Sequence, residues 1–126
     1  MAIAEPDLTP EERAAFEKGV AEFNAGCFFE CHDTLEDMWT GVRGPSRDFF
    51  QGLIQVSVAF YHLTSDNLPG AESMLNRALK RFEKYPDWYF GFDLGAHRAE
   101  LNGWIERWRG GDVGADARLP TWTFSK

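Results

Sequence analysis

A histidine and a carboxylate stand four residues apart in the first third of the chain, at His32 and Glu36. Residues four apart share one face of an α-helix, so their side chains can interact there. In such a pair the imidazole can act as a general acid or base, and the carboxylate can orient it. The rest of that helix face is expected to be apolar, with Phe28, Cys31, Leu35 and Trp39. Because a buried polar group without a hydrogen bond costs roughly 1–3 kcal/mol, we expect the pair to have further polar partners.

Five helices are predicted to position these residues. The first has Thr9 as its N-cap, Pro10 as its first helical residue and Glu12 in a capping box, and the segment Asn24-Ala25-Gly26 terminates it. The third is apolar on nearly all sides, which is typical of a helix at the centre of a bundle. The expected helices span residues 10–24, 28–40, 46–64, 70–84 and 96–109. The sequence thus predicts an all-α fold, a single compact bundle of about five helices built from antiparallel helical hairpins.

Two glutamines are the expected partners of the histidine and the carboxylate. The second and third helices are predicted to run antiparallel around a turn near residues 42–43, and residues equidistant from that turn lie at the same height. This places His32 level with about Gln55, and Glu36 level with about Gln51. We therefore expect four hydrogen-bonding side chains to meet between these two helices.

Two segments outside the helices are rich in aromatic residues. Residues 85–95 are expected to form an irregular loop folded onto the bundle. The C-terminal tail is expected to pack back as well, because exposed apolar side chains are unfavourable in water. Its apolar residues are Leu119, Trp122 and Phe124.

The polar cluster has three interpretations, and the first two stay open. It could be structural, fixing the register of two helices through its hydrogen bonds. It could instead line a pocket for a small polar ligand, with His32 and Glu36 as the catalytic candidates. The predicted ligand-binding residues are Glu30, His32, Glu36, Trp39, Gln51 and Gln55.

The third interpretation is a metal site formed by His32, Glu36 and His62, with Glu30 or Asp48 nearby. The sequence lacks the spacings that place two or three ligands on one helix face. In addition, His62 falls two turns beyond Gln55 on the predicted third helix. The pattern therefore favours no metal ion, and it identifies no cofactor or reaction.

Composition limits the classes of partner. The 126 residues suit one domain and carry a net charge of −7 without a cluster of basic residues, so neither nucleic acid nor an anionic membrane is an expected partner. No signal peptide is recognised, and no apolar run approaches the roughly 20 residues of a membrane helix. Cys27 and Cys31 are too unfavourably spaced on a helix for a disulfide. We therefore expect both thiols to be reduced and buried, and the protein to be cytoplasmic.

An adaptor that binds a protein or peptide without catalysis is the alternative function. Helical hairpins repeat weakly at a period of forty, so that Leu35 aligns with Leu75, and this resembles a tetratricopeptide-like hairpin with a longer period. We favour two similar hairpins over a true repeat. Trp88 and Phe90 could form the partner-binding patch, and the aromatic surface could also support self-association.

Two polar signatures in this order and spacing resemble the domain-of-unknown-function family numbered 309. The first reads Glu30-x-His32-x-x-x-Glu36-x-x-Trp39, and the second runs from Arg47 to Gln55. The resemblance covers residues of about 16–85, and leaves a C-terminal helix and tail at 94–126 unmatched. It implies a small all-helical bundle with no established activity. The signature positions are Glu30, His32, Glu36, Trp39, Gln51, Gly52 and Gln55.

Overall fold

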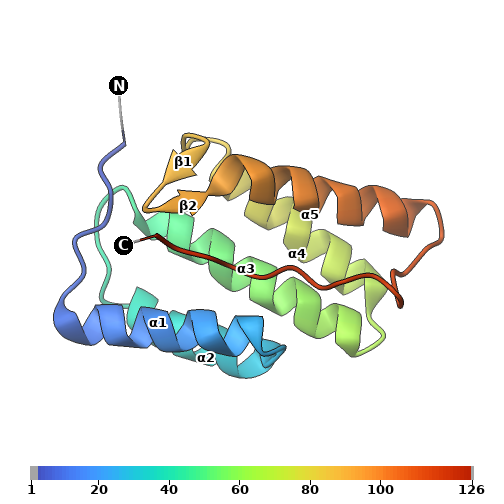
Figure 1. Cartoon of the computed structure of the whole chain (residues 1–126), viewed down its shortest axis with the longest axis horizontal. Coiled ribbons are helices and arrows are strands. Elements are labelled where there is room, and N and C mark those ends of the chain that lie inside the picture. Colours follow the sequence, from blue (N-terminus) through green and yellow to red (C-terminus); the bar gives the residue numbers. More distant parts are fainter. Residues whose placement is uncertain (1–2, 126) are drawn as a thin grey trace.

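A computed structural model describes residues 3–125 and confirms the predicted fold class. Five helices follow one another along the chain, with one very small antiparallel sheet before the last of them (Figure 1). The elements are α1 (Pro10–Asn24), α2 (Phe28–Trp39), α3 (Arg47–Thr64), α4 (Leu68–Phe82), β1 (Trp88–Tyr89), β2 (Phe92–Asp93) and α5 (Leu94–Arg109).

Capping residues set where several helices begin. The predicted capping box is present in α1, where Glu12 N–H donates to Thr9 Oγ1 at 3.1 Å and Thr9 N–H donates to Glu12 Oε1 at 2.9 Å. Both α4 and α5 begin two residues earlier than predicted. The reason is an N-cap that the sequence interpretation overlooked in each case, Asn67 for α4 and Asp93 for α5.

The central helix is α3, as its apolar sequence predicts. Figure 1 shows α1 and α2 on one side of α3 and α4 and α5 on the other, while the C-terminal tail runs along the bundle. Phe49, Phe50, Leu53 and Phe60 of α3 are fully or almost fully buried. Their burial contributes to the driving force that holds the two hairpins together.

The two helical hairpins have matching turns at an offset of forty residues. Gly26 and Asp66 both have positive φ, at 80° and 59°. In each turn the next residue donates its N–H to the carbonyl five residues before it, at 2.8 Å. Residues 31–40 and 71–80 also follow the same order of buried and exposed positions. Helices α2 and α4 are therefore placed equivalently after α1 and α3.

Residues 85–95 are more regular than predicted, because they contain the β1–β2 hairpin. Tyr89 pairs with Phe92, and the two turn residues, Phe90 and Gly91, both have positive φ. Such a turn normally contains Asn-Gly or Asp-Gly, so phenylalanine gave no signal for it. The Phe90 N–H donates to Glu5 Oε2 at 3.1 Å, and the Phe90 ring packs against Phe16, which together offset the cost of the left-handed backbone.

The tail packs back onto the bundle, as predicted. Trp122 is 1% exposed and its ring stacks on Phe23 with centroids 3.7 Å apart. Asn24 holds the Trp122 backbone through two hydrogen bonds, of 2.8 and 2.7 Å. The indole N–H of Trp122 donates to His97 Nε2 at 3.3 Å. The tail is therefore an integral part of the core.

Candidate functional site

The predicted contact between His32 and Glu36 is present on α2. His32 Nε2 lies 2.9 Å from Glu36 Oε2, and the second ring nitrogen, Nδ1, lies 3.5 Å from Asp33 Oδ1. The side chains of His32 and Glu36 keep 27% and 54% of their exposure, so the pair lies at the edge of the helix rather than in the core. The inward-facing position expected for this pair is therefore not observed. Both ring nitrogens lie beside carboxylates of the same helix, with Nε2 closer to its carboxylate than Nδ1.

Gln55 is buried, and its partner lies on α4. Its Oε1 accepts a hydrogen bond from Arg81 Nε at 3.2 Å. Arg81 also pairs with Asp48 at 2.6 Å, and Lys84 pairs with the same carboxylate. Those contacts, first the hydrogen bond from Lys84, lower the pKa of Asp48 below its usual range. Gln55 thus belongs to a polar cluster that joins α3 to α4.

Gln51 is half-buried on the same stripe of α3 as Asp48 and Gln55. Within residues 3–125, no hydrogen bond links either glutamine to the His32–Glu36 pair. The four side chains therefore form two groups rather than a single network. One group is exposed on α2, and the other faces α4.

Trp39 fixes the turn between α2 and α3. Its indole N–H donates to the Arg47 carbonyl at 3.0 Å, and the Arg47 guanidinium returns a hydrogen bond of 3.0 Å to the Trp39 carbonyl. The guanidinium also lies over the indole ring, 3.7 Å from its centroid. Trp39 and Arg47 together set the angle at which the two helices meet.

The remaining predicted residues lie apart from this pair. Glu30 is exposed in the first turn of α2. His62 lies at the end of α3, where its Nδ1 is 3.3 Å from Asn67 Nδ2. No group of three or more His, Cys, Asp or Glu side chains suited to a metal ion occurs in the described part of the chain.

Two exposed aromatic rings beside the pair were missed by the sequence analysis. Phe29 of α2 and Tyr61 of α3 are 50% and 39% exposed, and their ring centroids are 5.4 Å apart. The Phe29 ring is 6.0 Å from the His32 ring. The available signal was the spacing of three between Phe29 and His32, which places both on one face of α2.

The outer surface of α2 is strongly acidic. Its exposed carboxylates are Glu30, Asp33, Glu36 and Asp37. We call the aromatic pair, His32 and the three carboxylates nearest to them the α2–α3 face; it consists of Phe29, Glu30, His32, Asp33, Glu36 and Tyr61.

The two cysteines are free, as predicted, but only Cys31 is buried. Cys27 is exposed at the start of α2, which corrects the expectation of two buried thiols. Burial raises the pKa of the Cys31 thiol to about 12, and Glu22 adds to the rise. Cys31 is therefore a protonated core residue at neutral pH and a poor nucleophile.

A second surface lies on the other side of α1. A groove of about 920 Å³ runs between α1, the β1–β2 hairpin and the end of the tail. Trp88, which is 56% exposed, forms part of its wall, and Phe16, Phe90 and Phe124 contribute apolar surface. Arg13 lies at the same groove with its guanidinium 5.3 Å from the Phe90 ring centroid.

The fold and these sites define an all-α bundle of two matched helical hairpins, closed by a fifth helix and a packed tail. Within this class, residues 16–74, just under half of the chain, match the model of the family described as Domain of unknown function (DUF309). The matched segment includes the His32–Glu36 pair, Trp39 and both glutamines. The predicted resemblance is therefore confirmed.

Two bacterial relatives match parts of the chain. An "Uncharacterized protein" of Aquifex aeolicus (strain VF5) is 28% identical over 80 residues, which are 63% of this chain and 24% of that protein. The "Uncharacterized protein YpuF" of Bacillus subtilis (strain 168) is 33% identical over 54 residues, 42% of this chain and 31% of the relative. The matches thus span about a quarter and about a third of the relatives' own lengths. Separately, none of the helices described between residues 3 and 125 could cross a membrane.

Proposed function

We propose that this protein binds a small organic cation at the α2–α3 face and that His32 and Glu36 belong to the binding site. The supporting observation is the contact between two exposed aromatic rings, Phe29 and Tyr61, directly beside the His32–Glu36 pair. Exposed aromatic rings with carboxylates around them suit an ammonium or quaternary ammonium group, because ring faces and carboxylates both attract positive charge. The ligand class is therefore a small polar molecule with a positive charge.

Each part of the face has a distinct role in this proposal. The aromatic rings contact the alkyl groups around the cationic nitrogen. Glu36 and Asp33 supply negative charge, and the His32 ring lies between the two carboxylates. In this proposal the His32 ring, with carboxylates beside both nitrogens, serves as part of the binding face.

Other predicted residues fix the position of the helices that carry this face. Trp39 with Arg47 fixes the angle between α2 and α3, and Gln55 anchors α3 to α4. Glu30 adds a carboxylate one helical turn before Asp33 and strengthens the negative field around the site.

Choline and its neutral isostere 3,3-dimethyl-1-butanol provide the test. We expect choline to shift the backbone amide resonances of residues around Phe29 and His32 in NMR titrations, while the neutral alcohol leaves them unmoved. Phe29→Ala should weaken choline binding by about 2- to 30-fold, the loss that corresponds to one cation–π contact. Glu36→Gln should weaken it as well, and more so at low ionic strength.

Two controls separate the site from general charge effects. Glu106→Gln removes one exposed carboxylate from α5 and should leave choline binding unchanged. His32→Ala should fold normally, because the side chain lies at the surface of α2. Equal shifts with choline and the neutral alcohol, or equal affinity in the wild type and Phe29→Ala, would contradict the proposal.

A second candidate function is a peptide-binding adaptor that uses the groove beside Trp88. The specific observation is that Trp88 is 56% exposed at the wall of an aromatic groove, although large aromatic side chains are normally covered. Peptides selected from a random library on the wild-type protein should bind Trp88→Ala at least about tenfold more weakly, as for an interface hot spot. Phe29→Ala is the matched control and should bind them normally. Peptides that bind all three proteins equally would exclude this groove.

A further inference from the structure

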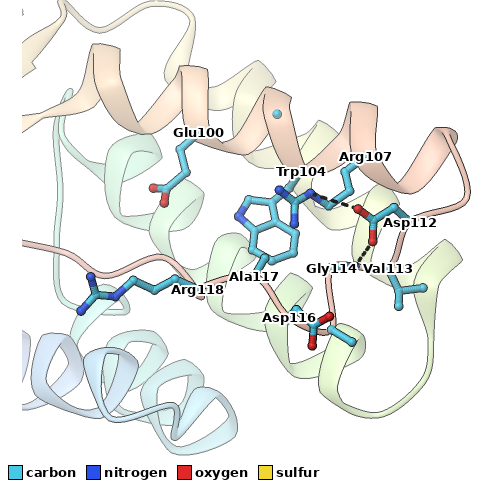
Figure 2. A pocket seen from close by; sticks show the side chains of 11 residues that line it. Glu100, Trp104, Arg107, Asp112, Val113, Gly114, Asp116, Ala117 and Arg118 are labelled. Carbon is cyan, nitrogen blue, oxygen red and sulfur yellow. Dashed lines mark hydrogen bonds and ion pairs between the residues drawn. The ribbon is translucent and has the colours of Figure 1, made fainter.

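A cavity of about 650 Å³ lies between α5 and the glycine-rich loop that follows it (Figure 2). Its volume falls within the range of small-molecule sites, roughly 300–1,000 Å³. The indole of Trp104, a residue only 5% exposed, forms its apolar wall. This cavity is remote from the α2–α3 face and shares none of its residues.

The loop that closes the cavity is fixed in place without a ligand. Gly114 has a φ of 80°, and a Cβ at this position would come within 2.6 Å of the Trp104 ring, so only glycine allows this approach. The Gly114 N–H donates to Asp112 Oδ1 at 2.8 Å, and Trp108 Nε1 donates to the Val113 carbonyl at 3.3 Å. The cavity is therefore largely preformed, which lowers the entropic cost of binding.

Charges of opposite sign stand at one end of the cavity. Figure 2 shows Glu100 and Arg118 on one side of the Trp104 ring and Asp112 and Asp116 on the other. Glu100 and Arg118 are not ion-paired with one another. At the other end, the Arg107 guanidinium already has two partners: it lies over the Trp104 ring, and its Nε is 3.8 Å from Asp112 Oδ2.

Buried His97 orients Glu100. His97 Nε2 accepts the hydrogen bond from Trp122, and an indole N–H can only donate, so the ring proton of a neutral His97 is on Nδ1. Nδ1 lies 3.4 Å from one carboxylate oxygen of Glu100. The Glu100 side chain is 42% exposed, so its carboxylate is accessible to a ligand. Because Trp122 and Arg118 belong to the same tail, the docking of Trp122 also holds Arg118 at this cavity.

We infer that this cavity binds a free α-amino acid with an apolar side chain. Such a molecule carries an ammonium and a carboxylate on one carbon atom, and these groups match Glu100 and Arg118 at one end of the cavity. The apolar side chain lies against the Trp104 indole, towards the Arg107–Asp112 pair. A peptide interior lacks both charges, and a simple anion or cation would leave either Glu100 or Arg118 without a partner.

The test is calorimetric titration of the full chain with L-phenylalanine and L-leucine. N-acetyl-L-phenylalanine and L-phenylalaninamide are the matched ligands, because each lacks one charge of the head group. We expect the free amino acids to bind and each blocked form to bind at least about tenfold more weakly, the loss expected for one charged hydrogen bond. Arg118→Gln and Glu100→Gln should weaken the free amino acids by a similar factor.

Matched surface variants make the result specific. Arg77→Gln, on the exposed side of α4, and Glu106→Gln, on the exposed side of α5, should bind the amino acids like the wild type. The inference is overturned if neither amino acid binds, if the blocked forms bind as tightly as the free ones, or if Arg118→Gln has no effect. Phe29→Ala should bind the amino acids normally, so this test and the choline test can fail independently.

Discussion

Replacing Trp122 by alanine is expected to lower the free energy of unfolding by about 3–5 kcal/mol, the usual range for removing a buried large aromatic side chain. The indole is 1% exposed, stacks on Phe23 and donates its N–H to His97. Its removal leaves a cavity between α1 and α5 and an imidazole nitrogen without its hydrogen-bond donor. Chemical denaturation followed by far-UV circular dichroism measures the effect.

The matched control is Trp88→Ala. Trp88 is 56% exposed and lies in the two-residue strand β1, so its removal should change the free energy of unfolding by no more than about 0.5 kcal/mol. A Trp122→Ala protein as stable as Trp88→Ala would show that the tail does not contribute to the core.

The second prediction concerns Gly52, one of the signature positions in the centre of α3. A Cβ at this position would lie 2.8 Å from Phe82 Cζ and 2.9 Å from Cδ1, and Phe82 is fully buried against α3. Gly52→Ala should therefore cost about 1–3 kcal/mol through overpacking, even though alanine is the better helix former. Thermal or urea unfolding provides the measurement.

Gly103→Ala, in contrast to Gly52→Ala, is expected to stabilise the protein. Gly103 is exposed in α5, and a Cβ there meets no atom within 4 Å. The same substitution should increase stability by up to about 1 kcal/mol, because alanine reduces the entropy of the unfolded chain and favours the helix. If both variants were stabilised, close packing of α3 on α4 at Gly52 would be refuted.

Helix positions were predictable because their signals are local. The capping box at Thr9 and Glu12, the glycine at the end of α1 and the apolar sequence of α3 each depend on neighbouring residues alone. The burial of Trp122 was predictable from its hydrophobicity. The early starts of α4 and α5 were missed because Asn67 and Asp93 were interpreted as loop residues instead of N-caps.

The partners of polar side chains were less predictable, because periodicity gives the face of a helix but not the helix that covers it. Gln55 was placed level with His32 by counting from the turn, which considers only two helices. Its actual partner, Arg81, comes from α4 and is brought in by tertiary packing. A guanidinium also forms a stronger hydrogen bond with an amide oxygen than a neutral group does.

The exposure of aromatic residues could likewise not be predicted from the sequence pattern. Phe29 and Tyr61 are residue types that usually lie in the core, and only the packing of α2 against α3 leaves their rings at the surface. Phe90 gave no turn signal, since its left-handed backbone is stabilised by the distant Glu5 and Phe16. Such contacts depend on the completed fold.

Both ends of the described chain are tied to the small β1–β2 hairpin. The Tyr89 hydroxyl donates to the Ala4 carbonyl across 85 positions of sequence, and the Ser125 N–H donates to the Gly91 carbonyl. Asn24 and Trp122 are joined across 98 positions. Closing such long loops carries the largest entropic penalty, so these ties are expected to form last during folding. We therefore expect the helical hairpins to assemble first. The β1–β2 hairpin, which lies between α4 and α5, then joins both ends of the chain to the bundle, and this should make unfolding cooperative.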